Sequence, residues 1–120
     1  MKYFFTRLYH RIIWSSAGIA HAWREEHSFR SWVWANLVSA ALALMLPLTM
    51  GERALILSLS MLIMAFELVN TAIEEVVDYI SKDHHPAAKA AKDCGSGAVF
   101  VSALAAGVAW VVVLVRIVVG

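Results

Sequence analysis

Two stretches of this chain lack any charged residue over the length that a helix needs to cross a lipid bilayer. They cover residues 31–51 and 94–115, and about 20 apolar residues are enough for one crossing. Between them, residues 54–66 are also uncharged, and apolar residues continue at helical spacing to about Ile80. We therefore predict three transmembrane helices, over residues 31–51, 54–80 and 94–116.

The rest of the chain is consistent with a membrane protein of a single domain, residues 1–120. Hydrophobic residues make up 61% of the sequence and charged residues only 16%, which is more apolar than ordinary soluble domains. Before the first uncharged stretch, Phe4, Leu8 and Ile12 recur at helical spacing beside a strip of basic residues. This pattern predicts an amphipathic helix on the membrane surface over residues 1–30.

The distribution of basic residues predicts the orientation in the membrane. Five precede the first predicted span and three follow the second, whereas only Arg53 and Arg116 fall on the opposite side. Basic residues are enriched in cytoplasmic segments. The N-terminus is therefore expected in the cytoplasm and the C-terminus outside, with no signal peptide in residues 1–30.

Four polar residues of the second predicted span share one helix face. At about 100° per residue, Glu67, Asn70, Glu74 and Asp78 lie within an arc of roughly 80°. Carboxylates stacked without a cation repel one another, so the strip predicts a functional site. Asn70 alone is equally well explained by a hydrogen bond between helices.

The depth of these carboxylates indicates what they do. Glu67 lies roughly 20 Å from the outer start of its span and Glu74 about 10 Å farther inward. An ionised carboxylate inside the hydrocarbon costs at least roughly 2.5 kcal/mol, and at this depth Glu67 is placed to deprotonate the hydroxyl of a membrane lipid. Glu74 and Glu26 are candidate oxygen ligands for Mg²⁺, and Lys92 and Arg7 are candidate phosphate ligands.

The usual nucleotide-binding motifs are absent. The chain has no G-x-x-x-x-G-K-[ST] loop, and Gly95-Ser96-Gly97 does not extend to G-x-G-x-x-G. We expect these glycines to permit close packing of helices. His84 and His85, in the predicted loop over residues 81–93, are secondary candidates for binding metal or phosphate.

The polar strip is part of a longer pattern that resembles the prokaryotic diacylglycerol kinase family. The pattern comprises Glu67-Leu68-Val69-Asn70-Thr71-Ala72-Ile73-Glu74, Asp78, His85, Ala91-Lys92-Asp93 and Gly95-Ser96, together with Ala22-Trp23, Glu26 and Phe29-Arg30. The register runs without gaps from about Phe5 to Trp110. The resemblance implies a lipid kinase of the bacterial inner membrane that uses ATP and Mg²⁺, assembled as a homotrimer with active sites shared between neighbouring chains.

The resemblance also implies roles for individual residues. It makes Glu67 the general base and Glu26 and Glu74 the metal ligands, with Asn70 and Asp78 in support. The residues implied to lie near ATP are Arg7, Trp14, Glu26, Glu74, Asp83, His85, Lys92 and Asp93. Those implied to lie near the lipid substrate are Arg7, Ser15, Trp23, Phe29, Arg30, Glu67, Ser96 and Trp110.

Several alternatives remain open at this stage. Ser31-Trp32 and Trp14 depart from the pattern of the diacylglycerol kinases, and the stretch from His85 to Asp93 is similar to the undecaprenol kinases of the same family. The lipid acceptor is thus diacylglycerol or, alternatively, undecaprenol. Outside this family, carboxylates within a span are also expected in a proton- or cation-conducting protein or in a structural membrane subunit.

Overall fold

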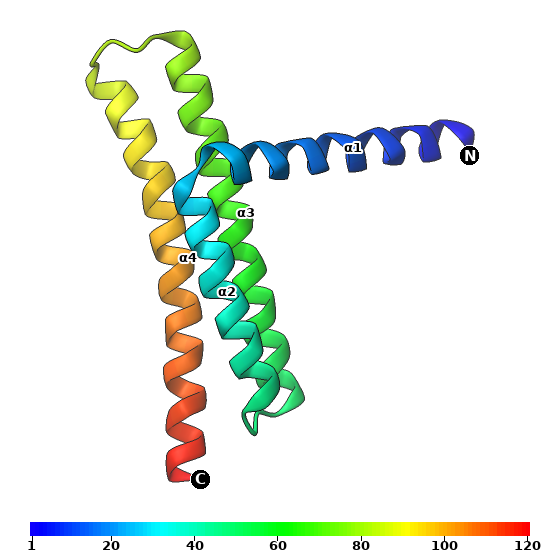
Figure 1. Cartoon of the computed structure of the whole chain (residues 1–120). Coiled ribbons are helices and arrows are strands. Elements are labelled where there is room, and N and C mark those ends of the chain that lie inside the picture. Colours follow the sequence, from blue (N-terminus) through cyan, green and yellow to red (C-terminus); the bar gives the residue numbers. More distant parts are fainter.

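The computed structural model describes residues 1–120 as four helices joined by short connections. The helices are α1 (Lys2–Glu25), α2 (His27–Met45), α3 (Met50–Ile80) and α4 (Pro86–Val119). Figure 1 shows α2, α3 and α4 forming a bundle in which α3 packs against both of the others, while α1 projects sideways from it. We call the end of the bundle at residues 46–49 the turn end and the end at residues 81–85 the loop end.

Two helices have the length and composition of membrane spans. They are α3 and α4, and only 28% and 11% of their most apolar windows are buried within the chain. An apolar helix of a soluble protein would bury most of this surface, so the exposed apolar faces indicate contact with lipid or with other chains. The predicted second and third spans thus correspond to α3 and α4, whereas the crossing of the membrane by α2 stays a prediction.

The helix ends at the turn differ from the predicted ones. The first span was expected to continue to residue 51, but α2 ends at Met45 and Leu46 is extended, with φ −81° and ψ 158°. This conformation is the one that a following proline, here Pro47, imposes on its neighbour. Thr49 and Glu52 then form a capping box, which begins α3 at Met50 rather than at residue 54.

The other connection is also shorter than the predicted loop over residues 81–93. The imidazole of His85 accepts a hydrogen bond from the N–H of Ala87, and Pro86 occupies the first turn of α4. A capping side chain followed by proline is a strong start for a helix. As a result, α4 begins eight residues before the expected start at Cys94, and its first turns extend beyond the predicted span.

The predicted surface helix over residues 1–30 is interrupted near its end. Glu26 is extended, with φ −115° and ψ 108°, and separates α1 from α2. The guanidinium of Arg30 donates hydrogen bonds to the carbonyls of Trp23 and Arg24, which stabilises this corner. The bend at Glu26 forms the corner between α1 and α2, which lies beside α3 (Figure 1).

The tightly packed core lies at the turn end. It consists of five buried apolar residues from the three bundle helices and the turn, Ala43, Leu48, Ile56, Ala109 and Val113. Polar side chains add bonds between helices. Asn36 donates to the carbonyl of Ser60 over 3.1 Å, and the indole N–H of Trp110 donates to Ser39 Oγ over 2.8 Å.

Candidate active site

Glu67 is buried inside the bundle and has no cationic partner. Its exposed fraction is 3%. Ser28, in the first turn of α2, donates a hydrogen bond of 3.3 Å to Glu67 Oε2, and none of the four ion pairs of the chain includes Glu67. A carboxylate in this environment keeps its capacity to accept a proton from an incoming hydroxyl group.

Asn70 and Glu74 continue the polar strip toward the loop end. Asn70 Nδ2 donates to Glu74 Oε1 over 3.3 Å, while Asn70 Oδ1 is buried without a hydrogen-bond partner. Gly95 of α4 faces this amide so closely that a Cβ atom at position 95 would overlap Asn70 Oδ1. The expected role of the glycines in close packing thus applies to Gly95, whereas a Cβ at Gly97 would meet open space.

Glu26 lies at the corner between α1 and α2, close enough to Glu74 for their charges to interact. Its pKa is raised above the ordinary value, chiefly because of burial and then because of the negative charges of Glu74 and Glu75. A divalent cation between Glu26 and Glu74 would relieve this repulsion, and two carboxylates suit Mg²⁺. No group of three or more His, Cys, Asp or Glu residues is arranged to hold a metal, so nucleotide phosphates would have to complete the shell.

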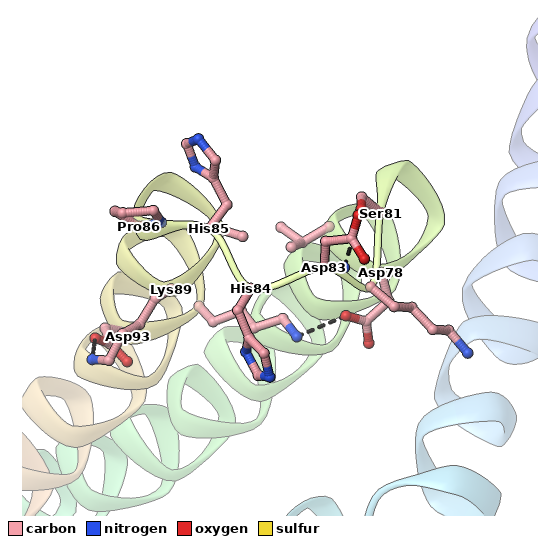
Figure 2. Close-up of a pocket in the computed structure, with 12 residues that line it drawn as sticks. Asp78, Ser81, Asp83, His84, His85, Pro86, Lys89 and Asp93 are labelled. Carbon is pink, nitrogen blue, oxygen red and sulfur yellow. Dashed lines mark hydrogen bonds and ion pairs between the residues drawn. The ribbon is translucent and has the colours of Figure 1, made fainter.

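A polar hollow of about 630 Å³ opens at the loop end, between α3 and α4 (Figure 2). Two ion pairs line it: Lys92 with Asp78 over 2.7 Å, and Lys89 with Asp93 over 2.6 Å. Four of the eight residues predicted for ATP are among its lining residues, Asp83, His85, Lys92 and Asp93. In volume and charge the hollow suits part of a nucleotide.

The two loop histidines differ in their surroundings. Figure 2 shows the rings of His84 and His85 pointing to opposite sides of the chain. The ring of His85 caps α4, a role that the analysis of the sequence did not assign although the following Pro86 was a signal for a helix start. His84 makes no hydrogen bond.

Two other residues predicted for ATP lie on the part of α1 that is far from the corner. Arg7 bonds to the hydroxyl of Tyr3, and Trp14 stacks on His10. At 1.5 Å per residue they lie roughly 28 Å and 18 Å along α1 from Glu26. A single chain therefore does not bring Arg7 or Trp14 to the Glu67 carboxylate.

The residues predicted for the lipid lie in several separate parts of the chain. Trp23, Phe29 and Arg30 lie at the corner near Glu67, with Phe29 buried. Ser15 lines a groove of about 300 Å³ between α1 and α3, and Ser96 follows Gly95. Trp110 lies elsewhere, against the core at the turn end, roughly 22 Å along α4 from Gly95.

Ser28 belongs to the site although no pattern in the sequence indicates it. Its hydroxyl reaches Glu67 only because the chain bends at Glu26 and brings the first turn of α2 alongside α3. No glycine or proline lies near Ser28 or near Glu26, where the helix breaks, to indicate the bend in advance. The contact follows from tertiary packing alone.

The sequence of this chain is similar to those of several known proteins. The family described as prokaryotic diacylglycerol kinase matches residues 13–114. A diacylglycerol kinase of Pseudomonas aeruginosa is 42% identical over 101 residues, which cover 84% of this chain and 82% of the relative. One of Escherichia coli is 36% identical over 110 residues, 92% of this chain and 90% of the relative. One of Haemophilus influenzae is 34% identical over 105 residues, 88% and 89%.

Proposed function

Since the chain belongs to the prokaryotic diacylglycerol kinase family, a family of lipid kinases, we propose that it transfers the γ-phosphoryl group of ATP to the hydroxyl of diacylglycerol. The products are phosphatidic acid and ADP. The observation that carries the proposal is the placement of Glu67, which is buried and free of any cation, seven residues from Glu74 on the same helix. Glu67, the proposed base for the lipid hydroxyl, and Glu74, the proposed ligand of the metal bound with ATP, thus lie on one polar strip.

The proposed chemistry is a direct in-line transfer in which Glu67 is the general base. Its carboxylate accepts the proton of the lipid hydroxyl while the hydroxyl oxygen forms a bond to the γ-phosphorus and the bond to the β-phosphate oxygen breaks. Ser28 orients the carboxylate through its hydrogen bond. No phosphorylated enzyme is required.

Glu26 and Glu74 are the proposed ligands of Mg²⁺. The fit is supported by the raised pKa of Glu26, which results first from burial and then from the negative charges of Glu74 and Glu75. When bound with ATP, the ion offsets the charge on the phosphate oxygens. Asn70 holds Glu74 through its side-chain amide, and Gly95 allows α4 to approach Asn70 closely.

ATP is proposed to enter from the loop end. Its base and ribose would occupy the hollow beside His85 and Asp93, and its phosphates would extend past Lys92 toward Glu74. Lys92 is held by Asp78, whose carboxylate keeps the ammonium beside the polar strip. The loop end, where the hollow opens, lies beyond α1 and away from the turn end (Figure 1), as expected for the aqueous side.

Arg7 and Trp14 are proposed to contact ATP on a neighbouring chain. They are remote from Glu67 within one chain and are exposed on α1, while large apolar faces of α3 and α4 are also exposed. A homotrimer with shared sites would cover part of these faces and place α1 of one chain over the site of another. The proposed orientation puts the N-terminus and the loop end in the cytoplasm and the C-terminus outside.

The test is a kinase assay of the purified chain in lipid bilayers. The assay supplies γ-labelled ATP and Mg²⁺ with diacylglycerol, with undecaprenol, or with no acceptor. We expect labelled phosphatidic acid to form fastest. Faster labelling of undecaprenol would overturn the choice of acceptor. Labelling of neither lipid, together with Mg²⁺-independent proton flux across the vesicles, would favour a conducting protein instead.

A further inference from the structure

One hydrogen bond joins the side chains of α1 and α3. His21 Nε2 and Glu75 Oε1 are 3.1 Å apart. Thr6 and Arg7 are the other residues of α1 whose side chains donate hydrogen bonds, and both bond only within α1. The His21–Glu75 pair is therefore the one directional side-chain contact between α1 and α3, in addition to the bonds by which Arg30 of α2 holds the corner.

The pair lies next to both proposed metal ligands. His21 precedes Glu26 by five residues on the helix that ends at the corner, and Glu75 directly follows Glu74. Beside the pair lies the groove of about 300 Å³ whose lining includes the small residues Gly18 and Ala72. Side chains leave this part of the space between α1 and α3 unfilled, so close packing does not hold the two helices together here.

The exposure of the pair argues against a role in folding. The two side chains are 43% and 56% exposed, and ion pairs with this much exposure contribute little to stability. A misplacement of about 1 Å in a catalytic site can nevertheless cost up to roughly 100-fold in rate. The pair is thus suited to set the distance between groups of the site on α1 and on α3.

We propose that His21 and Glu75 are positioning residues that set the separation of the Glu26 and Glu74 carboxylates, an inference that rests on the proposed function. The bond needs an N–H donor at position 21 and an oxygen acceptor at position 75. It does not need a charge on either residue. This requirement separates the positioning role from an electrostatic one.

The test uses variants that keep or remove the bond. His21→Gln and Glu75→Gln retain a donor and an acceptor, whereas His21→Leu and Glu75→Leu do not. We expect each leucine variant to raise the KM for Mg²⁺ by about 3- to 5-fold with a smaller change in kcat. The double leucine variant should resemble the single ones, because both remove the same bond. The glutamine variants should stay within about twofold of the unmodified protein.

His27→Leu provides the matched control. His27 is an exposed histidine near the same corner, and its ring contacts only Ser31 of its own helix, over 3.5 Å. Its loss should leave the KM for Mg²⁺ unchanged. A similar rise in His27→Leu, or glutamine variants as impaired as the leucine ones, would overturn the positioning role.

A second readout needs neither metal nor activity. Spin labels at Arg11→Cys and Tyr79→Cys, in a Cys94→Ser background, report the α1–α3 distance when labelled chains are diluted among unlabelled ones. We expect a narrow distance distribution with His21 or with His21→Gln and a broad one with His21→Leu. An unchanged distribution in His21→Leu would refute the proposal, whereas absence of lipid phosphorylation by the unmodified protein would refute only the proposed function.

Discussion

The turn end of the bundle and the corner where α1 joins it treat their charged residues in opposite ways. At the turn end, the Arg116 guanidinium donates to both carboxylate oxygens of Glu52 and to the carbonyl of Pro47. Arg53 donates to the carbonyls of Ala43 and Leu46. Near the corner between α1 and α2, Glu26, Glu67 and Glu74 lie close to one another and none of them is bonded to a cation.

The difference separates a structural region from a reactive one. Where every charge has a partner, the charges hold α2, α3 and α4 together over the packed core. Where carboxylates gather without cations, the fold bears a cost that ligands can relieve. Changes to these carboxylates should therefore alter catalysis with little effect on stability, and changes to the charges at the turn end should do the reverse.

The largest effect is expected from Glu67→Gln. The amide keeps the shape of the side chain and can still accept the bond from Ser28, but it cannot take a proton from a lipid hydroxyl. Loss of a general base typically costs 10²- to 10⁴-fold, so kcat should fall at least about 100-fold. Circular dichroism should show unchanged helix content and thermal midpoint. Near-normal turnover would reject Glu67 as the base.

Glu26→Gln and Glu74→Gln should act mainly on the requirement for Mg²⁺. Substitution of a residue that only hydrogen-bonds to a metal ligand typically lowers metal affinity by roughly 10-fold or more. Removal of a direct ligand should therefore raise the KM for Mg²⁺ at least about 10-fold. The measurement is a Mg²⁺ titration at saturating ATP and lipid. Exposed Glu25→Gln, one residue from Glu26, is the control and should leave the titration unchanged.

Gly95→Ala is expected to have an intermediate effect on both activity and stability. The added methyl group would meet Asn70 Oδ1 and Ile73, which forces α4 away from α3 and disturbs the bond from Asn70 to Glu74. Overpacking of this kind costs about 1–3 kcal/mol, and kcat should fall by about 10-fold for a displaced ligand. Gly97→Ala is the matched control, since its methyl group meets open space. Equal effects of the two variants would refute this account.

The smallest effect on catalysis is expected from Glu52→Gln at the turn end. The change weakens the bonds that the guanidinium of Arg116 and the backbone N–H of Thr49 donate to the Glu52 side chain, so the thermal midpoint should fall. The kcat of the folded protein should change by less than about twofold, because additive behaviour is usual for distant sites. Thermal unfolding followed by circular dichroism, combined with the lipid kinase assay, provides the measurement. A large loss of kcat without loss of stability would contradict the distinction between the turn end and the carboxylate corner.

Much of the architecture follows from local patterns that are visible in the sequence. Uncharged stretches and helical periodicity predict the long apolar helices that became α3 and α4. The spacing of Glu67, Asn70 and Glu74 alone assigns them to one helix face. The predicted positions of the helix ends were less accurate. They depend on Pro47 and on the caps at Thr49 and His85, which are local backbone effects that hydropathy does not record.

Tertiary structure decided which residues of the other helices face the polar strip of α3. The bend at Glu26, which has no proline or glycine beside it, brings Ser28 to Glu67 and His21 to Glu75 across 39 and 54 residues of sequence. The closeness of Gly95 to Asn70 is equally nonlocal. Periodicity specifies the direction of a side chain from its own helix axis. The partner that it meets depends on the angle and register at which another helix packs, and those are set by all the contacts of the bundle together.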